Sequence, residues 1–456
     1  MRIHLIAIGG SAMHNLALAL HSKGYKVSGS DDEIFEPSKS RLAAKGLLPY
    51  SLGWDESRIT PDIDAVILGM HARSDNQELI KAQELGLKIY SYPEYIYEQT
   101  KNKLRVVIGG SHGKTTITSM ILHVLKQCAI NCDYLVGAQL EGFDTMVKLS
   151  HESKVAIIEG DEYLASPIDR RPKFHLYHPN IAVISGIAWD HINVFPTFEN
   201  YVEQFDEFIK LIEPNGILTF CENDEVLVNI VKKSTNNTIQ KIAYGVPKHS
   251  IENGITYIYN SKDEKIPLKI FGNHNLMNLE AARNVCKALE ISEDDFNNAI
   301  LTFKGAAKRL EFVAGNNHFA VYKDFAHSPS KLKATTSAVK QQFPNRRIIA
   351  CMELHTFSSL NENFLNQYNG SMNTADEAIV YYNPHTIAHK KLKAITEEQV
   401  KIAFNNKNLK VYTNSQDLIQ YLKEQKWENS VLLLMSSGNF DGVDINKFGE
   451  ELVKNN

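Results

Sequence analysis

Short apolar runs alternate along this chain with longer segments in which apolar residues recur every three or four positions. Residues 3–8 form the first run, a glycine turn and a helical pattern follow it, and residues 26–31 predict a second strand. Apolar runs at residues 65–69 and 88–90 continue the alternation. Because strands that alternate with helices build a parallel sheet covered by helices, we predict a Rossmann-like domain over residues 1–102.

The alternation resumes after a charged stretch at residues 99–103, which we predict to be a linker. The predicted strands lie at residues 104–108, 155–158, 181–184 and 216–220, and the predicted helices at residues 118–126 and 276–289. A second doubly wound domain is therefore predicted over residues 103–312. Two polar, turn-rich stretches inside it, residues 232–237 and 247–269, predict surface hairpins.

The last third of the chain repeats the pattern. Apolar runs that predict strands lie at residues 319–324, 347–351, 377–382 and 430–435, with helical segments between them. We predict a Rossmann-like C-terminal domain over residues 313–456. The fold class expected for the whole chain is therefore α/β with three domains, which agrees with a length of 456 residues.

The composition narrows the class of protein. The chain is 43% hydrophobic and 22% charged, and no apolar run approaches the roughly 20 residues that span a bilayer, so we expect no membrane segment. A net charge of −4 offers no basic surface, and we expect no nucleic-acid partner. Five cysteines, scattered and odd in number, favour a reducing compartment such as the cytoplasm over a disulfide framework.

The strongest chemical signal is a glycine loop between a predicted strand and a predicted helix, Gly110-Ser111-His112-Gly113-Lys114-Thr115-Thr116. Successive backbone N–H groups at a helix N-terminus form an anion site, and a lysine completes it. We expect Lys114 to reach the β and γ phosphates of ATP and Thr115 to place its hydroxyl on Mg²⁺. The loop is shorter than the common Gly-x-x-x-x-Gly-Lys-Ser/Thr form. It predicts an ATP-consuming enzyme with a central P-loop ATPase-like domain.

Polar residues follow two other strands predicted for this domain. The acidic segment Glu159-Gly160-Asp161-Glu162 comes directly after residues 155–158, and Asp190-His191 follows residues 181–184. Ligands bind at the carboxyl ends of strands in open α/β sheets, and carboxylate oxygens suit Mg²⁺. We therefore expect a metal site there, and His191 could bring an imidazole to a second metal position.

The amino-terminal turn Gly9-Gly10-Ser11-Ala12-Met13 does not match the dinucleotide fingerprint, because Ala12 and Asn15 stand where glycines are needed. An NAD site is therefore disfavoured. Two interpretations remain, an anion-binding turn for the pyrophosphate of a nucleotide sugar and a plain strand-to-helix turn.

Together these motifs resemble those of the Mur ligases, the ATP-dependent amide-forming enzymes of bacterial cell-wall (peptidoglycan) synthesis, over essentially the whole chain. Residues 110–116 are similar to the family's Gly-Thr-His-Gly-Lys-Thr-Thr loop, and residues 159–162 are similar to its Glu-Ala-Asp-Glu motif. Asp190-His191 is similar to a pair whose histidine binds the metal. The resemblance implies that Thr115, Glu159 and His191 hold Mg²⁺ and that Lys114, Glu159 and His191 are catalytic.

Three later motifs extend the resemblance into the ATP site. Residues 272–278 are similar to an adenine-side motif, residues 308–311 to an Arg-x-Glu motif near the nucleotide, and residues 324–329 to a motif that closes over ATP. The ATP-binding residues that the resemblance implies are Gly110, Ser111, His112, Gly113, Lys114, Thr115, Thr116, Asn275, Asn278, Arg309, Asp324 and His327.

The amino-terminal segment resembles the members of the family that act on UDP-N-acetylmuramate, through residues 8–13 and 28–31. The residues that this implies for the sugar nucleotide are Gly9, Gly10, Ser11, Ala12, Met13, Ser30, Asp31 and His71. Two departures from the family concern other segments. Residues 353–358 replace an arginine-containing segment, and Asp206 stands where some members carry a carbamylated lysine, so no carbamate bridge is expected.

The amine substrate distinguishes the candidate functions. Residues 162–179 are similar to the muropeptide-recycling ligases, which implies joining of UDP-N-acetylmuramate to L-alanyl-γ-D-glutamyl-meso-diaminopimelate through an acyl phosphate. The alternative within the family is the ligase that adds L-alanine. A non-catalytic nucleotide-binding regulator is the alternative of another class, and the presence of Lys114, Thr115, Glu159 and His191 counts against it.

Overall fold

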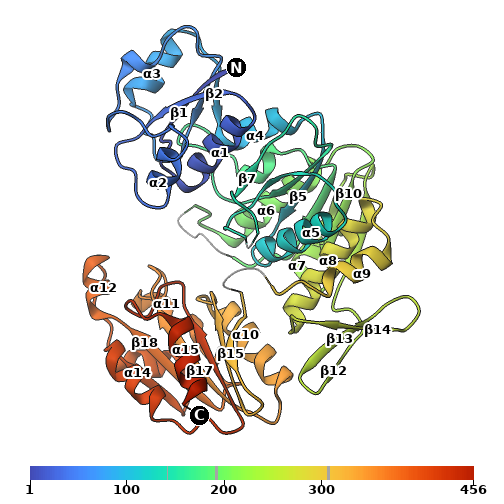
Figure 1. Cartoon of the computed structure of the whole chain (residues 1–456), viewed down its shortest axis with the longest axis vertical. Coiled ribbons are helices and arrows are strands. Elements are labelled where there is room, and N and C mark those ends of the chain that lie inside the picture. The colour runs from blue at the N-terminus through green and yellow to red at the C-terminus, as the bar shows by residue number, and fades with distance from the viewer. Residues whose placement is uncertain (141, 190–193, 306–308, 456) are drawn as a thin grey trace. The chain divides into compact units, whose positions relative to one another are not determined.

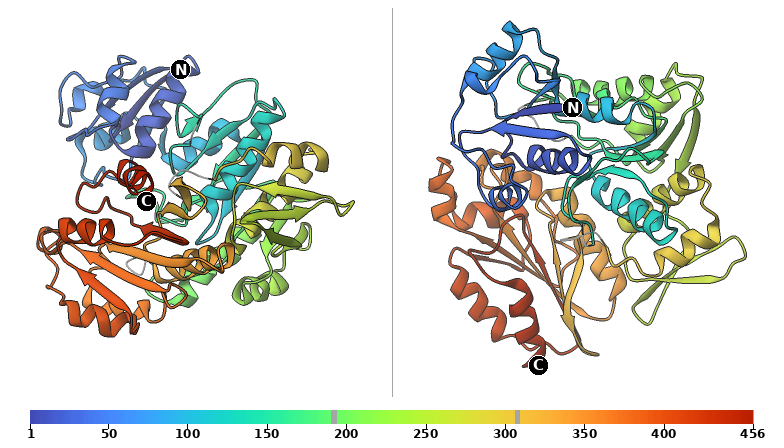
Figure 2. Two further views of the ribbon diagram at one scale, coloured as in Figure 1. Left: turned by 60° about the horizontal axis from the view of Figure 1, so that its bottom comes forward. Right: turned by 45° about the horizontal axis from the view of Figure 1, so that its top comes forward.

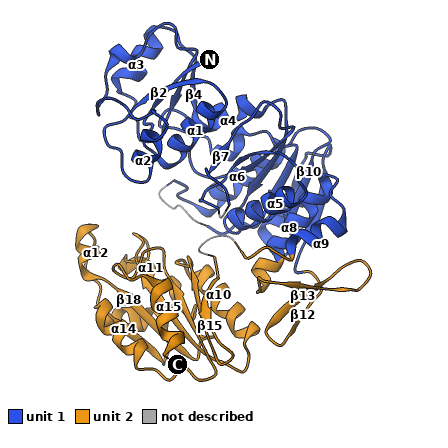
Figure 3. Ribbon diagram, in the orientation of Figure 1, with its two compact units in different colours: residues 1–246, 277–300 blue, residues 247–276, 301–456 orange. Residues whose placement is uncertain are grey.

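The computed structural model describes residues 1–140, 142–189, 194–305 and 309–455. The chain divides into two compact units, residues 1–246 with 277–300 and residues 247–276 with 301–456 (Figure 3). The division falls inside the helix α8 (Asn273–Ala288), so one continuous helix contributes residues to both units.

The amino-terminal part of the first unit is a four-stranded parallel sheet in the order β2-β1-β3-β4 (Figure 1). Its strands are β1 (Arg2–Ile6), β2 (Lys26–Ser30), β3 (Ala65–Leu68) and β4 (Ile89–Ser91), and its helices are α1 (Ser11–Ser22), α2 (Ser38–Ala43), η1 (Glu56–Arg58), α3 (Gln77–Glu84) and α4 (Tyr92–Thr100). Because β1 has β2 on one side and β3 on the other, the turn after β1 lies where the strand order reverses. Ligands of doubly wound folds bind at such a point.

The second sheet of this unit has seven strands in the order β11-β10-β9-β5-β8-β6-β7, and only β7 is antiparallel to its neighbour. The strands are β5 (Leu104–Gly109), β6 (Asp133–Leu135), β7 (Val147–Lys148), β8 (Val155–Glu159), β9 (Ile181–Ile184), β10 (Ile217–Cys221) and β11 (Gln240–Tyr244). The helices are α5 (Lys114–Gln127), η2 (Lys173–Leu176), α6 (Phe198–Lys210), α7 (Glu225–Lys233), the later part of α8, and α9 (Glu293–Ile300). The strand β5 lies between β8 and β9, so the loops that leave these three strands share one edge of the sheet.

Of the two stretches predicted to form hairpins, one prediction is wrong and the other is confirmed. Residues 232–237 are the end of α7 and a loop. The buried residues Leu227 and Val231 are four positions apart, which is helical spacing and explains why Glu225–Lys233 form a helix. Residues 247–269 form a three-stranded antiparallel sheet of β12 (His249–Glu252), β13 (Ile255–Tyr259) and β14 (Lys265–Leu268), and it belongs to the second unit. The predicted linker at residues 99–103 begins inside α4.

The main sheet of the second unit has the order β15-β16-β20-β17-β18-β19, with only β15 antiparallel. Its strands are β15 (Glu311–Gly315), β16 (Phe319–Asp324), β17 (Arg347–Leu354), β18 (Glu377–Tyr382), β19 (Leu409–Tyr412) and β20 (Ser430–Met435). Its helices are α10 (Pro329–Gln342), α11 (Glu362–Leu365), η3 (Asn366–Tyr368), α12 (Pro384–His389), α13 (Glu397–Phe404), α14 (Ser415–Lys423) and α15 (Ile445–Lys454).

Both faces of this sheet are covered, as the two views of Figure 2 show in orange and red. Along β17, Ile348, Ala350 and Met352 belong to one hydrophobic cluster, whereas Ile349 and Cys351 belong to the other. Since successive side chains of a strand point to opposite faces, a strand that is apolar at every position must be buried on both sides. This explains the continuous apolar run that predicted the strand.

Two expectations from composition can be compared with the structure. Within the described residues, no helix is both long enough and apolar enough to cross a membrane. All five cysteines are free thiols.

Candidate active site

The glycine loop follows β5 and begins α5, as predicted. Gly110 and Gly113 have φ angles of 121° and 80°, which favour glycine. A Cβ at Gly110 would lie 2.2 Å from the Ser185 hydroxyl oxygen, and one at Gly113 would lie 2.3 Å from Asn278 Oδ1. Both glycines are therefore required by conformation and by space. The second contact also brings Asn278, a predicted ATP residue, beside the loop.

Lys114 is held at the loop by two acceptors. Its Nζ donates to the carbonyl oxygen of Gly110 and to Glu162 Oε2, both at 2.7 Å. The side chain of Glu162 is 2% exposed and that of Lys114 is 13% exposed. Burial alone would lower the pKa of Lys114, but the carboxylates of Glu162, Asp161 and Glu159 raise it above its ordinary value. The ammonium group is therefore charged at neutral pH and available to an anion in the loop.

Thr115 and Glu159 form the next contact along the edge. The hydroxyl of Thr115 donates to Glu159 Oε1 at 2.8 Å, and the backbone N–H of Gly137 donates to Glu159 Oε2 at 2.8 Å. Burial, followed by the nearby charge of Asp161, raises the pKa of Glu159 above its ordinary value. A hydroxyl and a buried carboxylate with an acidic neighbour form an oxygen-rich set that fits Mg²⁺, since a divalent cation would offset the charge.

The histidine predicted to complete this metal set, His191, lies outside the described residues together with Asp190. Among the residues that the structure does describe, no group of three or more His, Cys, Asp or Glu side chains is arranged to hold a metal ion.

Several polar contacts that support the loop were not predicted. The Ser111 hydroxyl lies 2.9 Å from the Tyr201 hydroxyl and accepts the backbone N–H of Ala188 at 2.8 Å. Tyr201 in turn donates to Glu162 Oε1 at 3.2 Å. The Ser185 hydroxyl donates to the carbonyl oxygen of His112. The side chains of Ser111 and Thr116 are both buried. Tyr201 comes from α6, and nothing local in the sequence marks it.

The amino-terminal turn brings four of the predicted sugar-nucleotide residues together. The N–H of Gly9 donates to Asp31 Oδ2 at 2.7 Å, and a Cβ on Gly10 would lie 3.7 Å from the ring of His71. Burial raises the pKa of Asp31 to about 6. Met13 is buried in the core and so differs from the exposed Ser11.

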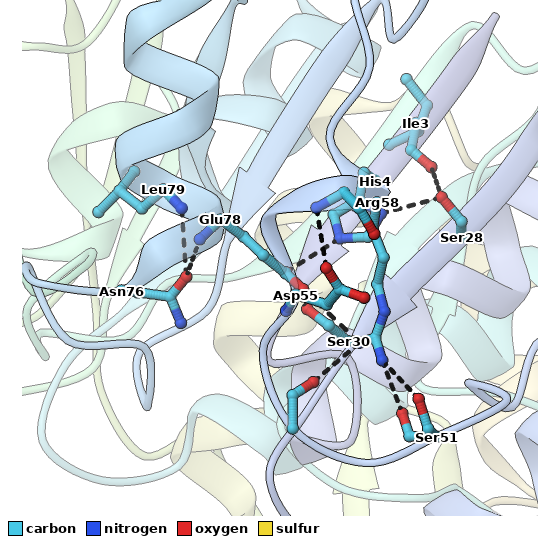
Figure 4. Close-up of polar contacts among 12 residues, drawn as sticks. Ile3, His4, Ser28, Ser30, Ser51, Asp55, Arg58, Asn76, Glu78 and Leu79 are labelled. Carbon is cyan, nitrogen blue, oxygen red and sulfur yellow. Dashed lines mark hydrogen bonds and ion pairs between the residues drawn. The ribbon is translucent and has the colours of Figure 1, made fainter.

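Ser30 is engaged by a buried network that the sequence did not predict (Figure 4). Its hydroxyl donates to Glu78, a carboxylate with 0% exposure that also bonds the ring of His4 at 3.2 Å and the N–H of Asp55 at 3.0 Å. Arg58 lies 3.6 Å from Glu78. Burial opposes the charge of Glu78, yet these hydrogen bonds hold its pKa below the ordinary value. Ser30 therefore helps to fix β2 against α3, in addition to its predicted contact with the sugar nucleotide.

A cavity of about 160 Å³ lies between this turn and the acidic edge. Ser11 and Ala12 contribute to its wall from the turn, and Glu159 and Asp161 contribute from the end of β8. A single small cavity thus connects the predicted sugar-nucleotide turn to the predicted metal residue.

In the second unit, Arg309, Asp324 and His327 occupy one region. Asp324 accepts the N–H of Leu310 at 2.5 Å, and burial raises its pKa to about 6 although the Arg309 charge opposes the rise. The Arg309 guanidinium lies 5.3 Å from the centre of the Phe325 ring. His327 Nδ1 lies 2.9 Å from the Phe325 carbonyl oxygen.

Asn275, at the start of α8, donates to the carbonyl oxygen of Phe271 at 3.0 Å. Its neighbour His274 has its pKa lowered to about 4 by burial and by the charge of Arg309. Asn275 belongs to the second unit, as Arg309 does, whereas Asn278 belongs to the first. Lys308, the first residue of the predicted Arg-x-Glu motif segment, is outside the described residues.

The chain matches three domain families along its length. Residues 2–103 match the Mur ligase family catalytic domain, residues 108–286 match the Mur ligase middle domain, and residues 308–438 match the Mur ligase glutamate ligase domain.

Curated relatives cover almost the whole chain. A UDP-N-acetylmuramate–L-alanine ligase from Clostridium kluyveri is 30% identical over an alignment of 454 positions, gaps included, which covers 96% of this chain and 95% of the relative. An enzyme of the same name from Clostridium acetobutylicum is 29% identical, with 98% of this chain and 96% of the relative covered.

Solved structures agree in fold. The UDP-N-acetylmuramate–alanine ligase of Thermotoga maritima has a TM-score of 0.68 at 21% identity, with 100% of this chain and 99% of that chain covered. A murein peptide ligase from Psychrobacter arcticus has a TM-score of 0.63 at 21% identity over the same shares. At this identity the likeness concerns the fold: three α/β domains.

Proposed function

The chain belongs to the Mur ligase family, the ATP-dependent ligases of peptidoglycan synthesis, and from this premise we propose that it joins UDP-N-acetylmuramate to L-alanine. The observation that carries the proposal is the similarity of almost the whole chain to curated ligases of that name. They favour the alanine alternative over the tripeptide that the sequence of residues 162–179 predicted.

The tripeptide L-alanyl-γ-D-glutamyl-meso-diaminopimelate is our second candidate, because one local feature favours it. Residues 162–179 resemble the recycling ligases and fold back on themselves at a bridge between Leu164 and Pro172. This segment places Lys173 against Asp161, beside the acidic edge. A murein peptide ligase is also among the structures that share the fold.

The proposed reaction begins with activation of the acyl donor. A carboxylate oxygen attacks the γ-phosphorus of ATP, the bond to the β-γ bridging oxygen breaks, and ADP leaves. Proteins catalyse such a transfer mainly by positioning the groups and neutralising charge. Lys114 supplies a fixed positive charge in the glycine loop, and Thr115 with Glu159 is suited to hold Mg²⁺. Bound Mg²⁺ would neutralise charge on the phosphates.

The second step forms the amide. The neutral amine of the incoming substrate attacks the acyl carbon, phosphate leaves, and the nitrogen loses a proton. An acyl phosphate reacts readily with water, so the site must exclude water while the intermediate exists.

The remaining site assignments are part of the same proposal. We assign the nucleotide to residues 110–116 with Asn275, Asn278, Arg309, Asp324 and His327, and the sugar nucleotide to the turn after β1 with Ser30, Asp31 and His71. We assign His191 to the metal. The functional domains are residues 1–102, 103–312 and 313–456. The five free cysteines agree with a cytoplasmic, reducing location.

One assay tests the proposal and separates the candidates. Purified protein is supplied with Mg²⁺-ATP and UDP-N-acetylmuramate, and phosphate release is compared with L-alanine, with the tripeptide and with no amine. We expect release that depends on L-alanine. Release only with the tripeptide would replace the first candidate by the second, and no release with either amine would favour a non-catalytic nucleotide-binding regulator.

A further inference from the structure

The cavity between the amino-terminal turn and Glu159 contains two tyrosines with unsatisfied hydroxyl groups. Tyr92, at the start of α4, and Tyr177, which directly follows η2, both line it. Both side chains are buried, and neither hydroxyl has a hydrogen-bond partner among the described residues. A buried hydroxyl without a partner costs free energy, and such groups are rare in folded proteins.

The surroundings of the two phenols set their chemistry. Burial, with a contribution from the Asp161 carboxylate, raises the pKa of Tyr92 and of Tyr177 above the ordinary value. Both phenols therefore keep their protons and can act as hydrogen-bond donors.

A lysine lines the same cavity. Lys173 Nζ lies 3.4 Å from Asp161 Oδ2, a loose contact for an ion pair, and 5.9 Å from the centre of the Tyr163 ring. The backbone N–H of Lys173 donates to the carbonyl oxygen of Tyr163 at 2.7 Å, which fixes the base of the side chain. The ammonium group is thus held at the cavity and can donate further hydrogen bonds.

The donor arrangement matches an anion with several oxygen acceptors. The cavity is too small for a sugar nucleotide, and Ser11 and Ala12 of the turn are among the residues that line it. Glu159 lines it as well and accepts from the Thr115 hydroxyl beside the phosphate loop. In the proposed reaction, only the carboxylate-bearing lactoyl arm of the acyl donor must extend from the sugar to the γ phosphate.

We propose that this cavity receives the lactoyl arm of the acyl donor, with Lys173, Tyr92 and Tyr177 donating to its oxygen atoms. The inference rests on the proposed function and adds to it the residues that distinguish a lactoyl-bearing sugar nucleotide from one without the arm. Lys173 also offsets the repulsion that Glu159 and Asp161 exert on a carboxylate.

Three variants test the assignment by binding. The Kd of UDP-N-acetylmuramate and that of UDP-N-acetylglucosamine, which lacks the lactoyl arm, are measured by calorimetry for Tyr92→Phe, Tyr177→Phe and Lys173→Met. A neutral hydrogen bond and a charged one differ in strength, so we expect a Kd for UDP-N-acetylmuramate raised about 3- to 10-fold by each phenylalanine and about 10- to 100-fold by methionine. The Kd of UDP-N-acetylglucosamine should stay within about twofold of wild type.

A tyrosine and a lysine away from the cavity serve as controls. Tyr95 is also buried on α4 with a hydroxyl that lacks a partner, but it does not line the cavity. Tyr95→Phe should leave both Kd values unchanged. Lys210, paired with Asp206 at 2.8 Å on α6, provides the lysine control, Lys210→Met.

Thermal unfolding without ligand separates the two possible roles of the hydroxyls, because a ligand-binding role and a structural role predict opposite changes in Tm. Removing an unpartnered buried hydroxyl should leave Tm unchanged or raise it. A lower Tm in Tyr92→Phe and Tyr177→Phe with an unchanged Kd for UDP-N-acetylmuramate would mean that the hydroxyls serve the fold, and would overturn the inference. Equal loss of both sugar nucleotides would also overturn it. If the wild-type protein binds UDP-N-acetylmuramate and turns it over, and the variants have the same Kd as wild type, only the cavity assignment fails. If the wild-type protein does not bind UDP-N-acetylmuramate, the proposed function fails as well.

Discussion

At the scale of single residues, the phosphate loop depends on a buried ion pair. Lys114 lies between the Gly110 carbonyl and Glu162, and the Glu162 carboxylate is further bonded by the Tyr201 hydroxyl. Breaking a buried pair by removing one partner leaves an uncompensated charge, which is far more costly than removing both charges together. Lys114 therefore affects both the chemistry and the stability of the domain.

The variant Lys114→Met should abolish ATP-dependent phosphate release and lower the free energy of unfolding by about 3 kcal/mol, because the buried Glu162 carboxylate loses its ion pair with the Lys114 ammonium. Adding Glu162→Gln should restore most of that stability without restoring activity. Chemical denaturation and the phosphate assay measure the two effects. Unchanged stability of Lys114→Met would contradict the importance of the pair, and near-normal turnover would contradict the assignment of the loop.

At the scale of elements, one arginine joins the start of β5 to two other segments. Arg105 has a side chain that is 3% exposed. Its Nε donates to the carbonyl oxygens of Tyr177 and His178, both at 2.9 Å, and its Nη1 donates to that of Lys101 at 2.7 Å. The end of α4 and the segment after η2 are thus fixed to the central sheet. Tyr177 is in the second of these segments, whereas Tyr92 lies at the opposite end of α4.

Replacement of Arg105 by methionine should cost about 3 to 5 kcal/mol of unfolding free energy, because several buried carbonyl groups lose their donor together. Arg105→Lys should recover less than half of this loss, since one ammonium cannot reproduce the planar guanidinium fork. Glu213→Gln is the matched comparison. Its carboxylate accepts from Arg105 at 3.1 Å but is 37% exposed, so we expect a change below about 1 kcal/mol. Similar losses in denaturation experiments for Arg105→Met and Glu213→Gln would show that the carbonyl contacts matter little.

At the scale of the whole molecule, the residues predicted for ATP fall in both compact units. Lys114 and Thr115 belong to the first unit, and Arg309, Asp324 and His327 belong to the second.

A non-hydrolysable ATP analogue with Mg²⁺, at 100 times its Kd, should stabilise the folded chain by about 2.7 kcal/mol, seen as a rise in Tm. EDTA should remove most of the rise, since the phosphate charge is then not neutralised. At the same analogue concentration, Arg309→Gln should reduce the rise, whereas Lys340→Gln, in an exposed pair with Asp376 at 2.8 Å, should not. An equal rise in Tm for wild type and Arg309→Gln would exclude Arg309 from the nucleotide site.

The sequence by itself predicted the alternation of strands and helices and the position of the phosphate loop. Apolar periodicity is a local property, so strands such as β5 and β17 could be predicted from residues adjacent in the chain. Gly110 and Gly113 could be singled out because their role depends on backbone conformation within the loop. Even here, the local pattern failed at residues 232–237, where polar residues concealed the end of α7.

The tertiary structure alone decided which side chains meet. The strand order β9-β5-β8 brings Glu162 to Lys114 across 48 residues and Glu159 to Thr115 across 44. The same holds for Glu78, which reaches His4 across 74 residues (Figure 4). Nor could the cavity with Tyr92, Tyr177 and Lys173 be predicted, since its walls come from separate elements. Such contacts depend on how strands pair and how helices pack over them, and no local pattern encodes that pairing.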